Sequence, residues 1–342
     1  MAAGQLPSFE PTDGVFITWL LYEIASPGMI FNSEILKRCW FLAGPTAVGK
    51  SAVSLALAEQ IDAEIISMDS MAVYRCMDLG TAKPSFHERE RIAHHVIDVV
   101  DPHEEFSVAE YVKLAQLAAT AIVDRGRTPL FVGGTGLYLR SILRGVFEGP
   151  EADWQLRGEL QQQLERHGRP WLHQQLAAMD DVTAQRLHIN DTRRVIRAIE
   201  VYRLTGIPLS QQHDQSPVAI NERSKAIFWL EPPRDWLHDR VNRRVDQMMA
   251  DGLLEETRQL LAMTPEPART ARQALGYREL IAHLEGSMSI ESAVDQIKTG
   301  TRQFAKRQHT WFRNLEECTS IPLTGHQSPD QLVEALVFAA DK

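Results

Sequence analysis

Cysteine is scarce in this 342-residue chain, and long apolar runs are missing. Its cysteines, Cys39, Cys76 and Cys318, form no CxxC pair, which speaks against a zinc ribbon or a disulfide framework and favours a reducing compartment. No apolar run reaches the length of a membrane span. A signal peptide requires basic residues before its apolar stretch, and the apolar segment 15–25 has none before it. We therefore expect a cytoplasmic protein with no membrane partner.

Positive charge is also in deficit. Lys and Arg total 36 against 45 Asp and Glu, which gives a net charge of −9. This balance excludes a bulk attraction to nucleic acid or to an anionic membrane, so any such binding needs a local basic patch. With 44% hydrophobic and 24% charged residues, the composition is that of an average globular protein and excludes collagen, coiled coil and wholesale disorder.

The order of the segments predicts an α/β fold built on a parallel sheet. Residues 1–36 contain acids but no base, and we expect them to be a weakly structured extension. Short apolar runs predict buried strands at 39–43, 64–68, 95–100, 129–132 and 225–230. Helical patterns lie between them, for example at 51–61 and at 107–124, where Ser107 and Glu110 form a capping-box pattern.

A long segment without strand patterns interrupts this alternation. Residues 151–215 are rich in Gln and Arg and predict several amphipathic helices. We therefore expect a helical insertion at 151–215 in a core formed by residues 37–150 and 216–342, with helices on both faces of the sheet.

The sharpest motif is the run Gly44-Pro45-Thr46-Ala47-Val48-Gly49-Lys50-Ser51, which fits the phosphate-binding loop GxxxxGK[ST]. The glycines let backbone N–H groups converge on an anion, and the helix that follows adds positive potential at its N-terminus. Lys50 can reach the outer phosphate, and the Ser51 hydroxyl can hold Mg²⁺. The loop predicts binding of a di- or triphosphate and leaves the reaction open.

Polar residues follow two other predicted strands. Asp69 ends the strand at 64–68, and Gly133-Gly134-Thr135 ends the strand at 129–132. Ligands of parallel sheets bind beyond the carboxyl ends of the strands, so both segments are expected beside the phosphate loop. Asp69 then helps to coordinate Mg²⁺, acts as a general base, or simply caps a surface turn.

Basic side chains gather in the second half of the chain despite the acidic balance. Arg193, Arg194 and Arg197 form one cluster, and Arg302, Lys306, His309 and Arg313 share one face of a predicted helix. Phe304, Trp311 and Leu315 fall on the opposite face and are expected to pack inward. Such stripes are typical of phosphate-backbone binding, although a solvated helix face has the same pattern. A third group, Arg240, Arg243 and Arg244, is a candidate anion clamp.

Six segments together resemble the bacterial tRNA dimethylallyltransferases, also called tRNA isopentenyltransferases. They lie, in the family's order, at 44–51, 69–84, 133–143, 190–202, 272–279 and 301–313. The resemblance implies transfer of a dimethylallyl group from dimethylallyl diphosphate to the exocyclic N6 amine of the adenosine just 3′ of the anticodon, in tRNAs reading codons that begin with U. It also implies Mg²⁺ as cofactor, and the anticodon stem-loop of tRNA as partner of an enzyme expected to be a monomer.

The resemblance implies roles for individual residues as well. Asp69 matches the family's general base, Thr135 matches a hydroxyl that contacts the diphosphate, and Arg244 joins the loop 44–51 in the diphosphate site. The segments that match tRNA-contacting regions are Asp69-Ser70-Met71-Ala72, Arg193-Arg194-Val195-Ile196-Arg197 and Arg272-Gln273-Ala274-Leu275-Gly276-Tyr277. The basic stripe adds Arg302 and Lys306 as expected tRNA contacts.

Two other functions share the same loop. A P-loop small-molecule kinase would use ATP as donor, but it leaves the basic helices unexplained. A P-loop RNA-binding protein would switch on nucleotide binding without transferring a group.

Overall fold

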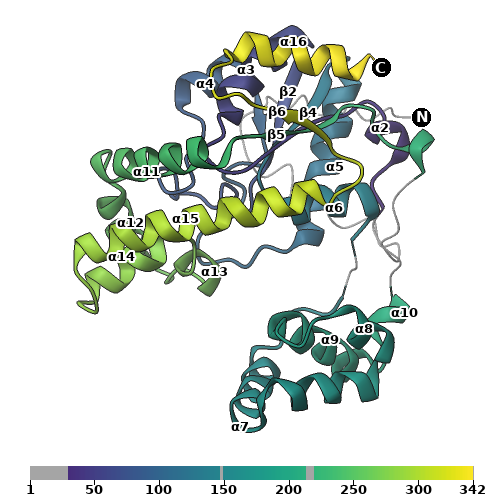
Figure 1. The fold of residues 1–342 in the computed structure, drawn as a ribbon, viewed down its shortest axis with the longest axis vertical. Coiled ribbons are helices and arrows are strands. Elements are labelled where there is room, and N and C mark those ends of the chain that lie inside the picture. The colour runs from purple at the N-terminus through teal and green to yellow at the C-terminus, as the bar shows by residue number, and fades with distance from the viewer. Residues whose placement is uncertain (1–29, 147–148, 213–218, 342) are drawn as a thin grey trace, which may run out of the picture.

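The computed structural model describes residues 30–146, 149–212 and 219–341 (Figure 1). Within these ranges one parallel sheet of six strands has the order β3-β2-β4-β1-β5-β6. The strands are β1 (Trp40–Ala43), β2 (Ala63–Met68), β3 (His94–His95), β4 (Thr128–Gly133), β5 (Ile227–Glu231) and β6 (Thr319–Pro322). The parallel α/β sheet predicted from the sequence is confirmed.

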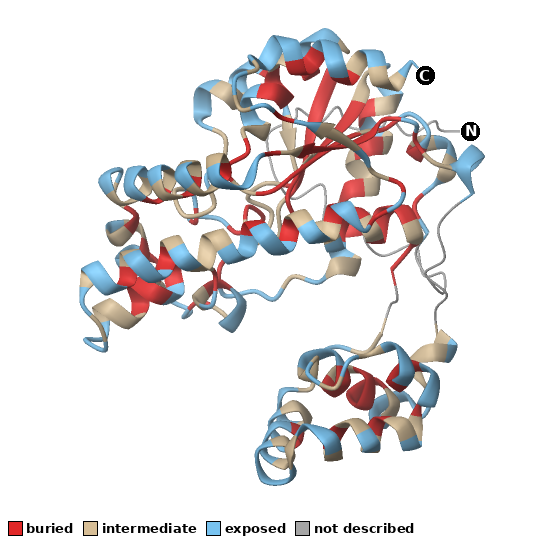
Figure 2. Ribbon diagram, viewed as in Figure 1, coloured by how far each residue is buried: buried red, intermediate tan, exposed pale blue. Residues whose placement is uncertain are grey.

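Helices cover both faces of the sheet, as expected. One face packs against α3 (Lys50–Gln60) and α16 (Pro329–Ala340), and the other against α5 (Val108–Asp124) and α6 (Gly136–Arg144). Successive residues of β1 alternate between two apolar cores, with Phe41 on the α5 side and Leu42 on the α3 side. Figure 2 shows the buried residues concentrated in this sheet and in the helix faces that pack on it.

Five helices of the second half of the core, α11 (Arg234–Ala250) to α15 (Ile290–Arg313), form an arm that projects sideways from the sheet (Figure 1). Its longest member, α15, runs back to the sheet and contacts both α6 and α11. None of the helices in the described ranges is long and apolar enough to cross a membrane. The helices outside the two layers and the insertion are α2 (Ser33–Leu36), α4 (Phe86–Arg91), α11 (Arg234–Ala250), α12 (Leu253–Leu261), α13 (Arg269–Arg272), α14 (Tyr277–Leu284), α15 (Ile290–Arg313) and the 3-10 turn η1 (Ile220–Glu222).

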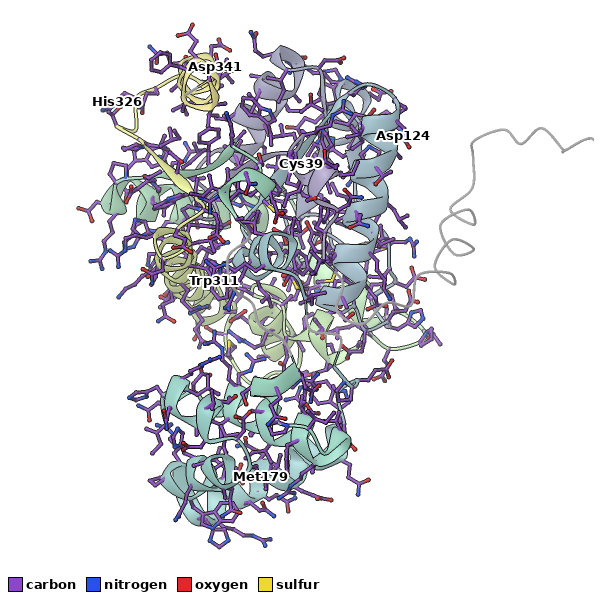
Figure 3. The ribbon with its side chains drawn as sticks, turned by 90° about the vertical axis from the view of Figure 1, so that its right-hand side faces the viewer. Cys39, Asp124, Met179, Trp311, His326 and Asp341 are labelled. Atoms are coloured by element: carbon purple, nitrogen blue, oxygen red, sulfur yellow. The ribbon has the colours of Figure 1, made fainter. Side chains whose placement is uncertain are left out.

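The segment between α6 and β5 forms helices that lie apart from the sheet. They are α7 (Trp154–Met179), α8 (Asp181–Arg186), α9 (Thr192–Thr205) and α10 (Leu209–Gln212). Helix α7 kinks at Gly168, which has a positive φ of 81° and is followed closely by Pro170. The helices enclose a small apolar core of their own, which includes Leu160, Leu176 and Ile199. In the turned view of Figure 3, Met179 at the end of α7 and Asp341 beyond α16 mark opposite ends of the molecule.

Two sequence predictions are wrong in part. The strand expected at 95–100 is reduced to His94–His95, because Val96 and Asp98 turn the chain with positive φ values of 59° and 57°. Val100 instead forms an isolated bridge with Tyr74.

The second correction concerns the start of the core. Residues 1–29 of the predicted extension, with the apolar segment 15–25, lie outside the described residues. The rest of it is not weakly structured, because Phe31 and Leu36 are buried in the main core. Phe31 packs edge-on against Phe131 of β4, with ring centroids 6.0 Å apart, and Asn32 caps α2. The strand β6 and the helix α16 were not predicted at all.

Candidate active site

A cleft of about 2070 Å³ lies where the carboxyl ends of the strands face the helical insertion. The P-loop, Asp69 and Gly133-Gly134-Thr135 line its core wall, and side chains of α7 and α9 line the opposite wall. Cavities for single small ligands measure roughly 300–1,000 Å³, so this cleft has room for a much larger partner beside a phosphate compound.

The phosphate loop connects β1 to α3 in the predicted way. Gly49 precedes the first turn of α3 with a φ of +104°, which only glycine adopts without strain, and so orients the loop amides at the helix N-terminus. The Lys50 ammonium group donates hydrogen bonds to the carbonyl oxygens of Gly44 and Pro45, both at 2.9 Å. The exposed Ser51 lines the cleft one residue further on.

Cations crowd around this loop. Burial and, to a smaller extent, the charge of the nearby Arg244 lower the pKa of Lys50 to about 7, although the Asp69 carboxylate opposes the shift. Burial likewise lowers the pKa of Arg244, with Asp69 again opposing. Arg240 donates from Nε to the Ala47 carbonyl at 2.8 Å and lies over the Trp236 ring at 4.7 Å. Half-buried cations that lie close to one another favour a bound anion, so this end of the cleft suits a phosphate group.

Three of the four arginines of α11 reach the site, so they remain candidates for the predicted anion clamp. Arg240, Arg243 and Arg244 all line the cleft.

Asp69 follows β2 at the edge of the P-loop. Its Oδ1 accepts the backbone N–H groups of Met71, at 2.9 Å, and Ala72, at 3.4 Å. The residue thus forms the turn cap that the sequence offered as one alternative, and it lines the cleft as well. In the described part of the chain Oδ2 accepts no hydrogen bond, so this oxygen is left for a proton donor in the cleft.

Thr135 ties the strand end of β4 to the Asp69 turn. Its Oγ1 accepts the Ser70 N–H at 3.1 Å, and its own N–H donates to the Met68 carbonyl at 3.1 Å. The sequence placed Asp69 and Thr135 at one edge of the sheet, and the structure brings them together there.

Gln308, which the sequence analysis did not select, joins the remaining two loops. From the buried face of α15, its Oε1 accepts the Thr46 N–H at 2.8 Å and its Nε2 donates to the Gly134 carbonyl at 2.9 Å. A Cβ atom on Gly134 would lie 2.2 Å from that Nε2, so the contact requires glycine. The sequence signal was weak, because one amide in a basic helix resembles any other.

Glu256 holds the loop that follows Asp69. One carboxylate oxygen accepts the N–H groups of Asp78 and Leu79 at 2.9 and 2.8 Å, and the other accepts the Tyr277 hydroxyl at 2.6 Å. Burial, followed by the Glu256 charge, raises the pKa of Tyr277, so this hydroxyl stays a donor. Tyr277 thus has a structural role that its place in a predicted tRNA segment did not reveal.

A family model described as IPP transferase matches residues 72–315. The chain belongs to the IPP transferase family. The tRNA dimethylallyltransferase of Symbiobacterium thermophilum is 47% identical over 298 residues, which cover 86% of this chain and 92% of that protein. That of Desulforudis audaxviator is 48% identical over 279 residues, or 81% of this chain and 89% of the relative.

Solved structures agree with this membership of the IPP transferase family. The full-length tRNA isopentenylpyrophosphate transferase of Bacillus halodurans has a TM-score of 0.65 and 39% identity, covering 89% of this chain and 96% of the other. A eukaryotic dimethylallyltransferase acting on tRNA has a TM-score of 0.67 and 28% identity, covering 83% and 73%.

Most residues that the resemblance assigns to the IPP transferase sites lie on the cleft wall. Those that line it are Thr46, Ala47, Gly49, Lys50, Ser51, Asp69, Ser70, Met71, Ala72, Thr135, Arg193, Ile196, Arg197, Arg244, Gln273, Ala274, Leu275, Gly276 and Tyr277. Those that do not are Gly44, Pro45, Val48, Arg194, Val195, Arg272, Arg302 and Lys306. Val195 is fully buried inside the insertion, and Arg272 pairs with Glu285 at 3.2 Å. No residue-level role is tested by these positions, so the assignments stay predictions.

Helix α15 presents a different face to the cleft from the basic stripe. Gln303, Phe304 and Arg307 line the cleft, whereas Arg302 is bonded to Asn242 at 2.6 Å. The prediction that Phe304 packs inward is wrong, because its side chain is 38% exposed and Ala305 takes the buried position. Trp311 and Leu315 do pack against the core as predicted, and Trp311 covers Gly136.

A buried carboxylate organises the insertion wall. Glu200 is fully buried on α9 and accepts two hydrogen bonds from Arg157, at 2.8 and 2.9 Å, and one from Arg197 at 2.5 Å. Although burial alone raises it, the pKa of Glu200 lies below its usual range because the hydrogen bonds from both arginines outweigh burial. Arg197 also donates to the Pro150 carbonyl at 2.8 Å, which fixes the start of the insertion.

Proposed function

We propose that this chain transfers a dimethylallyl group from dimethylallyl diphosphate to the N6 amine of the adenosine just 3′ of the anticodon, in tRNAs reading codons that begin with U. The observation that carries the proposal is the cluster of half-buried cations at the P-loop, set beside Asp69 in a cleft larger than a small acceptor needs. Membership of the IPP transferase family supports the prenyl donor and the tRNA acceptor.

The reaction is a substitution at the first carbon of the isoprenoid. The N6 lone pair forms the new N–C bond, the C–O bond to the diphosphate breaks, and the diphosphate leaves with the electron pair. Asp69 takes the proton from N6 through the carboxylate oxygen that its backbone contacts leave free. Lys50, the loop amides, Arg240 and Arg244 stabilise the charge that develops on the leaving oxygen.

The target base has to leave the stack of the anticodon loop to reach this site, as in other enzymes that modify bases. Exposed Arg193 and Arg243 line the cleft on opposite walls and suit contacts to RNA phosphates on the two sides of such a base.

The residues present fit Mg²⁺ in one way. Among the described residues no group of three His, Cys, Asp or Glu side chains could hold a metal. Mg²⁺ commonly keeps several waters and binds through substrate phosphates with few protein ligands, so the exposed Ser51 hydroxyl beside the loop suffices. When bound there, the ion would neutralise charge on the diphosphate.

The experiment that tests the proposal compares donors and acceptors directly. With Mg²⁺ present, dimethylallyl diphosphate should raise the melting temperature and ATP should not, and the labelled prenyl group should appear on adenosine of unmodified tRNA. Protection by ATP alone, with phosphate transfer to a small molecule, would instead establish the kinase that shares this loop. We also propose that the enzyme works as a cytoplasmic monomer, which sedimentation with and without tRNA would test.

A further inference from the structure

Trp154 is an aromatic side chain on the insertion wall that none of the steps above uses. It opens helix α7, lines the cleft and is 46% exposed. Two guanidinium groups lie over its ring: that of Arg157, at 4.9 Å from the ring centroid, and that of Arg269, at 5.0 Å. Arg157 belongs to the same helix, whereas Arg269 belongs to α13 of the core. The Trp154–Arg269 contact therefore spans the cleft.

The two arginines are held very differently. Arg157 is fixed by its paired hydrogen bonds to the buried Glu200, at 2.8 and 2.9 Å. The guanidinium of the exposed Arg269 forms neither a hydrogen bond nor an ion pair with any residue that the structure describes, so its contact with the indole ring is the one that holds it. An exposed cation–π contact contributes only about 0.5–1 kcal/mol. Arg269 can thus leave the ring at little cost, whereas Arg157 cannot.

An aromatic ring flanked by arginines in a cleft for RNA is the arrangement that binds unstacked bases. We propose that Trp154 is a stacking platform for one unpaired nucleotide of the anticodon loop, distinct from the adenosine that is modified, and that Arg269 occupies this place until RNA enters. The base replaces Arg269 on the indole ring, and the freed guanidinium remains beside the RNA backbone. This inference rests on the proposed tRNA substrate.

The test measures binding of a hairpin RNA with the sequence of an anticodon arm. Trp154→Ala should weaken binding by roughly 5- to 150-fold, the range for loss of one base–aromatic stack, and Trp154→Phe should restore most of it. The matched control is Phe86→Ala, which removes a ring that is 77% exposed on α4 and does not line the cleft. Melting temperature and affinity for dimethylallyl diphosphate should stay unchanged in all three variants.

Abasic nucleotides locate the partner. Each unpaired loop position is made abasic in turn, and at one of them Trp154→Ala should cost no further affinity, because the base that it stacks is already gone. If Trp154→Ala costs the same at every position, the ring stacks no base and the inference is overturned.

The double variant of Trp154 and Arg269 distinguishes base stacking from a role in which Trp154 only holds Arg269 across the cleft. If Trp154 acts only by holding Arg269, the cost of Trp154→Ala vanishes in the Arg269→Ala background, which also overturns the inference. If it stacks a base, the cost persists there. Failure of the wild-type protein to bind the hairpin would contradict the proposed function itself, and is thereby distinguishable from either result.

Discussion

The two walls of the cleft differ in how their basic side chains are paired with negative charge. On the core wall, Lys50 and Arg244 are half-buried, and burial lowers the pKa of each; Arg244 lowers that of Lys50 further, and Arg240 that of Arg244. On the insertion wall, Arg157 and Arg197 share the buried carboxylate of Glu200, which holds both in place and offsets one of their two positive charges. The core wall is therefore short of negative charge until a ligand supplies it, whereas the insertion wall is built to keep its shape. Substitutions on the core wall should therefore change donor affinity, and substitutions on the insertion wall should change RNA affinity.

The largest effect is expected at the chemical step on the core wall. Asp69→Asn keeps the oxygen that accepts the backbone N–H groups but removes the base, so single-turnover prenyl transfer should slow by roughly 10²–10⁴-fold. Binding of dimethylallyl diphosphate with Mg²⁺, measured by calorimetry, should persist. Asp330→Asn, at a second carboxylate on the cleft wall, is the matched control. Loss of Mg²⁺-dependent donor binding in Asp69→Asn would show that the residue serves the metal.

On the insertion wall, Glu200→Gln should affect RNA and spare the donor. It leaves two arginines beside a neutral amide, and removing one partner of a buried ion pair costs about 3–5 kcal/mol. Hydrogen exchange should accelerate in α7 and α9 but not in β1 or β4, and tRNA affinity should fall while donor affinity holds. If exchange rises equally in the sheet, the two walls are not independent.

Gln308→Leu tests the link between the loops of the core wall. It leaves the Thr46 N–H and the Gly134 carbonyl without their partner, and an unpaired buried polar group costs about 1–3 kcal/mol. Donor affinity should fall by roughly 5- to 150-fold, while Gln303→Leu on the cleft face of the same helix should leave it unchanged. Equal losses in both variants would rule out a specific role for the bridge.

The lowered pKa of Lys50 predicts a pH dependence of donor binding. Below about pH 7 the ammonium group is already charged, whereas above it a proton must be taken up when the diphosphate binds. Affinity should therefore fall by up to about tenfold for each pH unit above that value, with proton uptake visible in buffers of different ionisation enthalpy. Lys50→Arg, which stays charged, should lack both effects. Equal proton uptake in this variant would assign the titration to another group.

The smallest effect concerns two neighbours on α15. Arg307 lines the cleft and Lys306 does not. Arg307→Ala should therefore reduce the slope of log affinity for tRNA against log salt concentration by about 1, and Lys306→Ala should reduce it by less. Salt titrations of hairpin binding compare the two. A larger change of the slope in Lys306→Ala, or in the double variant of Arg302 and Lys306, would show that the RNA binds along the basic stripe and not at Arg307.

The sequence was sufficient for features whose cause is local. The phosphate loop, its helix and the Ser107 capping box follow from neighbouring residues, and the position of Asp69 and Thr135 follows from the rule that parallel strands end at one edge. The sequence analysis did not identify Gln308, Glu200 and Glu256, because partners far along the chain define their roles. Gln308 and Thr46, for example, lie 262 positions apart.

Other misses have different causes. The short strand β6 is too weakly apolar to show a pattern, and none of its residues is buried. Phe304 was misplaced because helical periodicity identifies a face but not what covers it, and here a cleft lies where packing was expected.

The strand order has a consequence for how the protein is made. Strand β1 pairs with β5, which follows the insertion in the sequence. Helix α3 starts at the phosphate loop and packs against α16, which comes later still. A ribosome therefore releases the insertion, with its own apolar core, after β4 but before β5 and α16, which complete the packing of β1 and α3. We expect the insertion to gain structure first during synthesis, and the donor site, which needs Arg244 and Gln308, to assemble only once most of the chain has been translated.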